Sequence, residues 1–192
     1  MKVFITDIAG FLGSHLAKKL KEFSDKQKIE FFCSAFYPDG VKFLISIGVK
    51  KFKIASRTCM LTDPNSLEVL QEKARSKKEI FISMGMGGNK KKISKIFENN
   101  KTTFCYCISD YPLNFDKINW IDAVKYDGFS DHTMDIVAPI LFTLLKKQKK
   151  SRKIYIEKHV KMINSGGPDA STSISTEKLS EMVKRIRMIE KM

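Results

Sequence analysis

The sequence predicts an α/β protein of parallel strands and helices, and it favours a barrel over an open doubly wound sheet. One observation is that short runs rich in aromatic and β-branched residues alternate with longer amphipathic runs. Strands separated by helices pair in parallel through right-handed crossovers. A second is that polar side chains recur where five successive expected strands end, which is where such folds bind ligands. Five contributing strands favour a barrel mouth over a crevice between two strands.

The expected elements follow one another along the whole chain. The strands are expected at residues 2–6, 30–34, 51–55, 79–83, 103–108, 126–130 and 153–157. The helices are expected at residues 14–23, 40–47, 65–73, 90–99, within 136–147, and at 176–192. The last helix has the clearest pattern, since its apolar residues repeat at spacings of three and four and Ser175 can cap its first turn.

The chain of 192 residues is long enough for one well-buried domain, and its charge is strongly basic. With 35 Lys and Arg against 21 Asp and Glu, the formal net charge is +14. Such a charge attracts nucleic acid, acidic membrane surfaces, or phosphorylated and carboxylated small molecules. The lysine runs at 90–92 and 146–153 lack interleaved aromatic residues and fit solvated helix ends, so we do not expect a nucleic-acid partner.

The cysteines and the apolar runs indicate a cytoplasmic protein. The four cysteines have no zinc-binding spacing, which suits a reducing compartment. Asp7 interrupts the first apolar run, so we expect no signal peptide. The longest apolar stretch, Ile136–Leu145, contains Pro139 and is far shorter than the roughly 20 residues that span a bilayer. We therefore expect no contact with a membrane.

Two of the three histidines stand at the ends of expected strands, in Ser130-Asp131-His132-Thr133 and in Glu157-Lys158-His159. Side chains two apart in a strand share a face, so Ser130 with His132, and Glu157 with His159, point the same way. These four groups would make a site for a metal ion or an anion. The alternative is a pair of unrelated surface histidines.

Several segments in order resemble the sialic acid synthase family, whose barrel enzymes make N-acetylneuraminate and related nonulosonic acids. The matching segments are FFCSAFYPDGVKFLISIGVKKFKIAS, FISMGMGG, CYCISDYP, GFSDHT, IYIEKH, GPD and EKLSEMVKRIRMIEK. The resemblance implies a partial TIM (βα) barrel at residues 28–192, with about six of the eight βα units. Residues 1–27 lie outside these segments, and we expect them to form a separate Rossmann-like strand–turn–helix remnant.

The resemblance implies a condensation of phosphoenolpyruvate with N-acetylmannosamine or a related N-acylated hexosamine, aided by a divalent metal, typically Mn²⁺. His132 and His159 match the metal ligands, and Glu157 matches a catalytic glutamate beside the metal. Lys53 matches a lysine that holds phosphoenolpyruvate and serves catalysis. The other substrate-binding positions implied are Ser56, Ser83, Ser109, Tyr111, Ser130 and Asp169.

Simpler readings stay open for several of these residues. Lys53 could be a lysine that merely extends to solvent from a strand end. The serines at 56, 83 and 130 could stabilise turns, and Gly167-Pro168-Asp169 is an ordinary turn sequence. Two positions also depart from the family pattern: Thr58 replaces an acidic residue, and Ser109 replaces a residue that is often asparagine.

The first 27 residues do not resemble the first two βα units of the family, which carry a glutamate and a lysine of the site. We also expect no counterpart of the family's C-terminal antifreeze-like domain in these 192 residues. Instead, MKVFITDIAGFLGSHLAKKL resembles the opening of NAD-dependent sugar epimerases, with Gly10 and Gly13 in place but Asp7 where the first glycine belongs. We expect no bound NAD, and we expect Lys2–Thr6 to fill a barrel edge beside Glu30–Ser34.

The sequence is compatible with four functions. The first is a synthase-like enzyme. The second is a non-catalytic remnant or an assembly partner, which would form a homodimer or receive the missing units from a complementing chain, because open edge strands invite pairing. The third is an NAD-dependent sugar-nucleotide epimerase or dehydratase. The fourth, suggested by charge alone, is nucleic-acid binding, whose affinity would fall steeply with salt.

Overall fold

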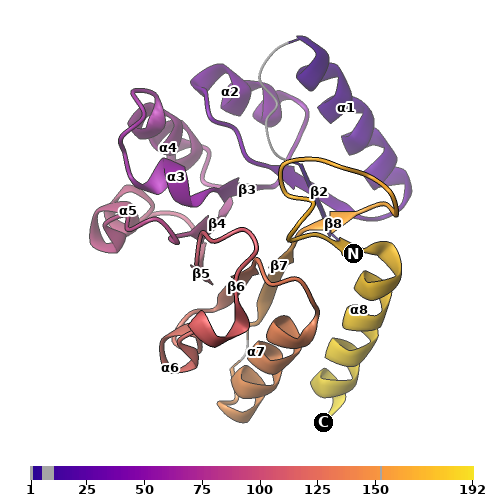
Figure 1. Ribbon diagram of the computed structural model, residues 1–192. Helices are drawn as coiled ribbons and strands as arrows, with labels where there is room; N and C mark the ends of the chain where they lie inside the picture. Colours follow the sequence, from indigo (N-terminus) through magenta and orange to yellow (C-terminus); the bar gives the residue numbers. More distant parts are fainter. Residues whose placement is uncertain (1, 6–10, 152) are drawn as a thin grey trace. The chain divides into compact units, whose positions relative to one another are not determined.

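The computed structural model describes residues 2–5, 11–151 and 153–192, which form two compact units that divide after Thr102 (Figure 1). Each unit has parallel strands that carry its helices on one side (Figure 1). The alternation of strands and helices predicted from the sequence is therefore present in both units.

The first unit contains four parallel strands that neighbour one another in chain order. These are β1 (Lys2–Ile5), β2 (Glu30–Cys33), β3 (Lys51–Ile54) and β4 (Glu79–Ser83). Its helices are α1 (Phe11–Lys26), α2 (Pro38–Ser46), α3 (Ser56–Cys59), α4 (Ser66–Arg75) and α5 (Lys90–Ile96). Pro38 opens α2, where its missing N–H costs no helical hydrogen bond.

The N-terminal strand β1 pairs with β2 along its whole length, from Lys2 opposite Glu30 to Ile5 opposite Cys33. This pairing confirms that the first strand lies beside the strand expected at Glu30–Ser34. Of the glycine motif, Asp7 and Gly10 lie outside the described residues, and Gly13 lies within α1. A domain boundary after residue 27 stays a prediction.

The register of β3 and β4 separates an apolar face from a polar one. Phe52 pairs with Ile80, and Ile54 with Ile82; all four are buried, and alternation sends them to one side of the strands. Lys53 points to the other side. On that side, at the amino-terminal end of the strands, a lysine bridges two glutamates. The ion pairs are Lys51 to Glu30 at 2.9 Å and Lys51 to Glu79 at 3.1 Å.

The second unit has three parallel strands in chain order, β5 (Thr102–Cys107), β6 (Gly128–Asp131) and β7 (Tyr155–Lys158). Its helices are η1 (Phe115–Lys117), α6 (Trp120–Ala123), α7 (Val137–Gln148) and α8 (Thr176–Lys191). Two short strands, β8 (Val160–Lys161) and β9 (Ile174–Ser175), form a separate parallel pair. The core lies between strand and helix, where Phe129 stacks on Phe142 at 5.2 Å between ring centroids.

Most predicted elements are present, with small corrections. The strands expected at 126–130 and 153–157 begin two residues later, at Gly128 and Tyr155. Tyr126 instead closes a turn, donating its backbone N–H to the carbonyl of Ala123 at 3.1 Å. The short elements α3, η1, α6, β8 and β9 were not predicted, because elements of two to four residues show no periodicity. The predicted cap of α8 is confirmed, since Ser175 accepts a hydrogen bond from the Lys178 N–H.

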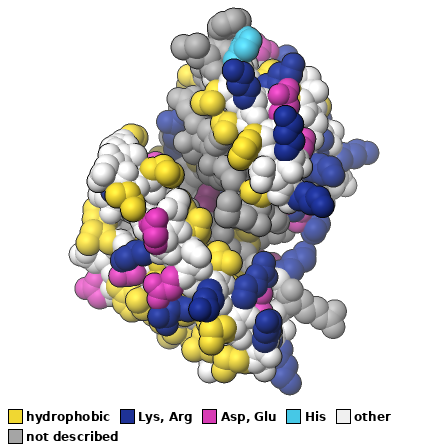
Figure 2. Space-filling model, turned by 90° about the vertical axis from the view of Figure 1, so that its right-hand side faces the viewer, with side chains coloured by type: hydrophobic (Ala, Val, Ile, Leu, Met, Phe, Trp, Pro, Cys, Tyr) yellow, Lys and Arg dark blue, Asp and Glu magenta, His cyan; other side chains and the backbone are white. Residues whose placement is uncertain are grey.

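The expected partners depend on whether a helix could cross a membrane and on how charge is distributed over the surface. No helix in the described ranges is both long and apolar enough to cross a membrane. Figure 2 shows many Lys and Arg side chains on the face that it displays, together with acidic and hydrophobic ones.

Candidate functional site

Two histidines and a tyrosine face one another in the second unit. His132 follows β6 directly, His159 follows β7 directly, and Tyr111 lies in the segment after β5. The ring centroids of the two histidines are 5.3 Å apart, and the Tyr111 ring lies 4.2 Å from His132 and 6.1 Å from His159. Side chains from the carboxyl ends of three neighbouring strands therefore converge in this unit.

Each histidine directs its Nδ1 atom toward an oxygen atom. The Nδ1 of His132 lies 2.6 Å from the carbonyl oxygen of Ile108, and that of His159 lies 3.6 Å from a carboxylate oxygen of Asp169. A histidine that binds a metal usually engages a carbonyl or carboxylate in this way, which orients its Nε2 atom for the ion. Burial lowers the pKa of His132 and so favours the neutral imidazole, the form that binds metals.

The two imidazoles fit part of the coordination shell of a divalent ion. Metal–nitrogen distances of about 2.1 Å place two neighbouring ring centroids about 5 Å apart, close to the 5.3 Å observed. Among the described residues, no group of three or more His, Cys, Asp and Glu is placed to hold a metal ion. The remaining ligands of a six-coordinate ion such as Mn²⁺ would therefore be oxygen atoms of substrate and water.

Ser130 and Glu157 lie on the same face as the histidines. They are register partners on β6 and β7, two residues before His132 and His159, and paired residues on parallel strands point to the same side. The carboxylate of Glu157 opposes the lowering of the His132 pKa, so its negative charge acts on that ring. Ser130 is buried.

Tyr111 is held as a neutral phenol. Burial, together with the thiol of Cys107 and the carboxylates of Asp169 and Glu157, raises the pKa of Tyr111 to about 12. Its hydroxyl therefore stays a hydrogen-bond donor at neutral pH. The Oγ atom of Ser109 is enclosed, and its hydrogen bonding to Tyr111 slightly opposes the rise of the Tyr111 pKa.

Asp169 lies in a loop that its own backbone organises. Its carbonyl oxygen accepts hydrogen bonds from the side chains of Thr172 and Ser173, at 3.1 and 2.7 Å. Its carboxylate is half exposed while facing His159. The structure thus places Asp169 beside a predicted metal ligand, and the turn reading of Gly167-Pro168-Asp169 is also correct.

In the first unit, Lys53 and two serines form a second group. The Lys53 ammonium group donates to the hydroxyl of Ser83 at 2.6 Å, and the Ser56 hydroxyl accepts from the backbone N–H of Gly85 at 2.9 Å. All three side chains are buried, so Lys53 does not extend to solvent from the strand end. Thr58, at the position that is acidic in the family pattern, is buried in α3.

A second buried lysine, which the sequence motifs did not predict, lies behind Lys53. The Nζ of Lys73, on α4, donates to the carbonyl oxygens of Ala35 at 3.0 Å and Lys53 at 3.1 Å. Burial lowers the pKa of Lys73 to about 7. Its position gave a signal, because it follows the buried residues Val69 and Leu70 at spacings of four and three and so falls on the core face of the helix.

A buried ion pair behind the histidines was also missed. Asp131 and Lys158, each immediately before a histidine, lie 2.7 Å apart with almost no exposed side-chain surface. The alternation of strand side chains had placed both on the face opposite the histidines. The alternation thus indicated that Asp131 and Lys158 share a face, but it does not show that the two charges are in contact.

The predicted site residues therefore fall into two groups, one in each unit. The second unit brings together Tyr111, Ser130, His132, Glu157, His159 and Asp169, with Ser109 nearby. The first unit brings together Lys53, Ser56 and Ser83 in the segments where β3 and β4 end. The catalytic, substrate-binding and metal-binding roles of these residues stay predictions.

Comparisons with known proteins identify the family of the chain. The model of the NeuB family matches residues 11–192. An uncharacterised protein of Methanocaldococcus jannaschii is 32% identical over 188 residues, covering 91% of this chain and 52% of that protein. An N,N'-diacetyllegionaminic acid synthase of Legionella pneumophila is 29% identical, covering 89% of this chain and 50% of that enzyme. The chain spans about half the length of these curated relatives.

The fold has a close counterpart among solved structures. The crystal structure of an N-acetylneuraminic acid synthetase from Leptospira borgpetersenii in complex with citrate superposes with a TM-score of 0.82 at 25% identity, covering 99% of this chain and 72% of that one. This likeness confirms the predicted fold class, an α/β partial TIM barrel.

Proposed function

The chain belongs to the NeuB family, and we propose from this premise that it serves the condensation of phosphoenolpyruvate with an N-acylated hexosamine. The products would be a nonulosonic acid and phosphate. Carbon 3 of phosphoenolpyruvate attacks the aldehyde of the open-chain sugar, water adds at carbon 2, and phosphate leaves. N-acetylmannosamine is the sugar that the resemblance suggests. The observation that carries the proposal is the pair of histidines, His132 and His159, with both Nδ1 atoms turned to oxygen atoms.

In this proposal the second unit handles the sugar. A divalent ion held by His132 and His159, Mn²⁺ by the resemblance, would polarise the aldehyde oxygen when bound. Glu157, on the same face, would orient the water or carry a proton. Tyr111 would donate a hydrogen bond to the sugar through a phenol that stays protonated at neutral pH, and Asp169 would accept one.

The first unit would handle phosphoenolpyruvate. A buried ammonium group such as that of Lys53 holds a phosphate or carboxylate as a point charge. Ser83 already lies within hydrogen-bond distance of that group, and Ser56 lies at the start of α3. Their hydroxyls would donate to the oxygen atoms of the substrate.

A second candidate is a role in assembly, as a homodimer or with a complementing chain. Its support is that β1 is the outer strand of its sheet and pairs with β2 on one side, since an open strand edge invites pairing with another chain. Residues 1–27 also lack the glutamate and lysine of the family's first two strands. None of the four cysteines forms a disulfide, which supports a cytoplasmic location for either role.

Titration of the protein with Mn²⁺, followed by electron paramagnetic resonance, tests the metal site. We expect His132→Ala and His159→Ala each to weaken Mn²⁺ binding by at least about tenfold, because each substitution removes one of the two proposed protein ligands. His15→Ala is the matched control, since His15 is exposed on α1 in the other unit. Equal affinity in all three variants would reject the site.

The reaction itself is tested by phosphate release from phosphoenolpyruvate with N-acetylmannosamine and Mn²⁺. We expect release that depends on both the sugar and the metal, and that is lost in Lys53→Met. If manganese binds normally but no phosphate appears, light scattering then tests the second candidate. A monodisperse, inactive monomer would count against assembly as well.

A further inference from the structure

The ladder between β6 and β7 ends at a buried pair of opposite charges. Asp131 and Lys158 are the last register partners of the two strands, and His132 and His159 are the next residues on each strand. The Nζ of Lys158 lies 2.7 Å from a carboxylate oxygen of Asp131, with 2% and 0% of the two side chains exposed. The pair thus joins the strand ends directly before the two histidines.

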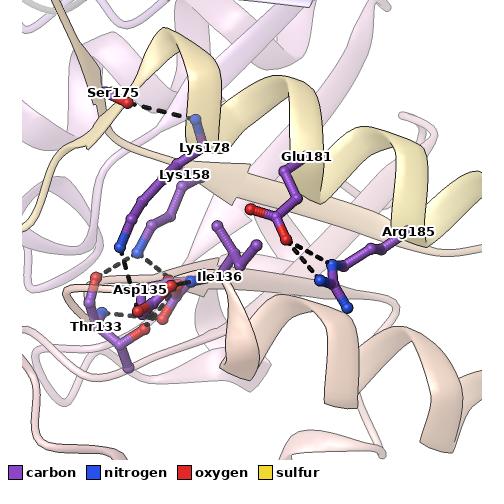
Figure 3. A network of polar contacts seen from close by, with 9 residues as sticks. Thr133, Asp135, Ile136, Lys158, Ser175, Lys178, Glu181 and Arg185 are labelled. Atoms are coloured by element: carbon purple, nitrogen blue, oxygen red, sulfur yellow. Dashed lines mark hydrogen bonds and ion pairs between the residues drawn. The ribbon is translucent and has the colours of Figure 1, made fainter.

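The same carboxylate shapes the backbone around His132. Asp131 accepts hydrogen bonds from the backbone N–H of Thr133 at 2.9 Å and from its hydroxyl at 3.0 Å. This arrangement is an Asx turn, with His132 as its middle residue. Lys158 also donates to the carbonyl oxygen of Thr133, and Figure 3 shows Lys158 and Thr133 converging within one network. A shift of either charged side chain would therefore move the turn that carries His132.

The backbone carbonyl group of each histidine also accepts a hydrogen bond from another segment. The carbonyl oxygen of His132 accepts from the N–H of Leu113 at 2.9 Å, and that of His159 accepts from the N–H of Ile174 at 3.0 Å. These bonds hold each strand end separately. At the last ladder pair, Asp131, Lys158 and Thr133 provide a side-chain link between the ends of β6 and β7.

We propose that Asp131, Lys158 and Thr133 are positioning residues that set the separation of the His132 and His159 rings. The importance of that separation for metal binding rests on the proposed function, whereas the separation itself does not. The three side chains lie on the far face of the strands from the rings. They act through the backbone, because adjacent residues of a strand move together.

The first test is nuclear magnetic resonance of metal-free protein with labelled histidines. The chain has three histidines, so few ring signals need assignment. In the wild type we expect a nuclear Overhauser effect between the rings of His132 and His159, which are 5.3 Å apart between centroids. In Lys158→Met and Asp131→Asn we expect this effect to be lost.

The second test is Mn²⁺ affinity, measured on the same samples at equal folded fraction. We expect a loss of about tenfold in both single variants, the usual lower bound when a residue that orients metal ligands is changed. The double variant Asp131→Asn/Lys158→Met leaves no unpaired buried charge, so it stays folded while it still lacks the link. It should lose the ring contact and the affinity as well, whereas Lys158→Arg should retain both.

Lys146→Met is the matched control. Lys146 is likewise a buried lysine of the second unit, but it donates to the carbonyl oxygens of Tyr126 at 2.7 Å and Val124 at 3.4 Å, before the start of β6. Its loss should destabilise the unit without changing the histidine contact or Mn²⁺ affinity. The same response in Lys146→Met as in Lys158→Met would overturn the proposal.

The outcomes separate this proposal from the proposed function. A wild type that binds no Mn²⁺ but loses its ring contact in Lys158→Met would reject the function and support the positioning. A wild type that binds Mn²⁺, with contact and affinity unchanged in the double variant, would overturn the positioning and leave the function intact. A wild type without any contact between the two rings would also overturn it.

Discussion

Each unit buries a lysine behind its group of polar side chains, and the two lysines differ in the groups that their ammonium ions contact. Lys73, in the first unit, donates to the carbonyl oxygens of Ala35 and Lys53. Lys158, in the second, faces the carboxylate of Asp131. Carbonyl dipoles only partly replace hydration, so burial lowers the pKa of Lys73 to about 7. Burial also lowers the pKa of Lys158, but the charge of Asp131 opposes that shift.

The comparison indicates two different ways of holding strand ends. A lysine that binds carbonyl groups can lose its proton and remain a donor, so its contribution varies with pH. A buried ion pair needs both members, because removal of one leaves the other charged and desolvated. The stability of the first unit should therefore depend mainly on pH, through Lys73. The stability of the second should depend mainly on whether both members of its ion pair are present.

The largest effect is expected for Lys158→Met. It leaves the Asp131 carboxylate buried without its cation, and such changes lower the free energy of unfolding by about 3–5 kcal/mol. Urea unfolding measures the change. The double variant Asp131→Asn/Lys158→Met should recover most of the loss, because no buried charge remains. Equal stability of the single and double variants would contradict the role of the charge pair.

A smaller effect, of about 2 kcal/mol, is expected from pH through Lys73. Its folded pKa of about 7 lies below the ordinary value of 10.5, so the unfolded chain holds one more proton between these values. The free energy of unfolding of the wild type should therefore rise from about pH 7 to about pH 9, relative to that of Lys73→Met. Below about pH 7 both states are protonated, and the full cost of burying the charge is present. A wild-type advantage that does not change with pH would show that Lys73 keeps its proton.

The smallest effect is expected for Lys178→Met. Lys178 pairs with Asp135 at 3.2 Å, at the edge of the network in Figure 3, and both side chains are about half exposed. Exposed pairs contribute about 0–1 kcal/mol, so the urea midpoint should barely move. A loss as large as that of Lys158→Met would mean that the network acts as one unit, and not through its buried pair.

The sequence predicted the faces of the strands better than the contacts across them. A period of two placed Ser130 with His132 and Glu157 with His159, and the structure has all four on one side of β6 and β7. It also placed Lys53 at a strand end, although not its bond to Ser83. The prediction that Lys2–Thr6 pairs with the next strand is confirmed for β1.

Contacts between segments far apart in the chain could not be predicted from the sequence. Lys73 and Ala35 are 38 residues apart, and Asp131 and Lys158 are 27 apart. Periodicity could show that each side chain faces inward, but the same pattern fits an apolar core position. Which partner a buried charge meets depends on how strands and helices pack, and that is settled by the burial of the surrounding apolar residues.

The amino-acid sequence by itself therefore determined the order of strands and helices, the side to which each polar residue points, and the family motifs. These depend on local backbone geometry, which repeats every two or 3.6 residues. Only the tertiary structure decided that two histidines lie 5.3 Å apart and that a buried ion pair joins the strands behind them. Such separations depend on the register between strands, which many side chains set together.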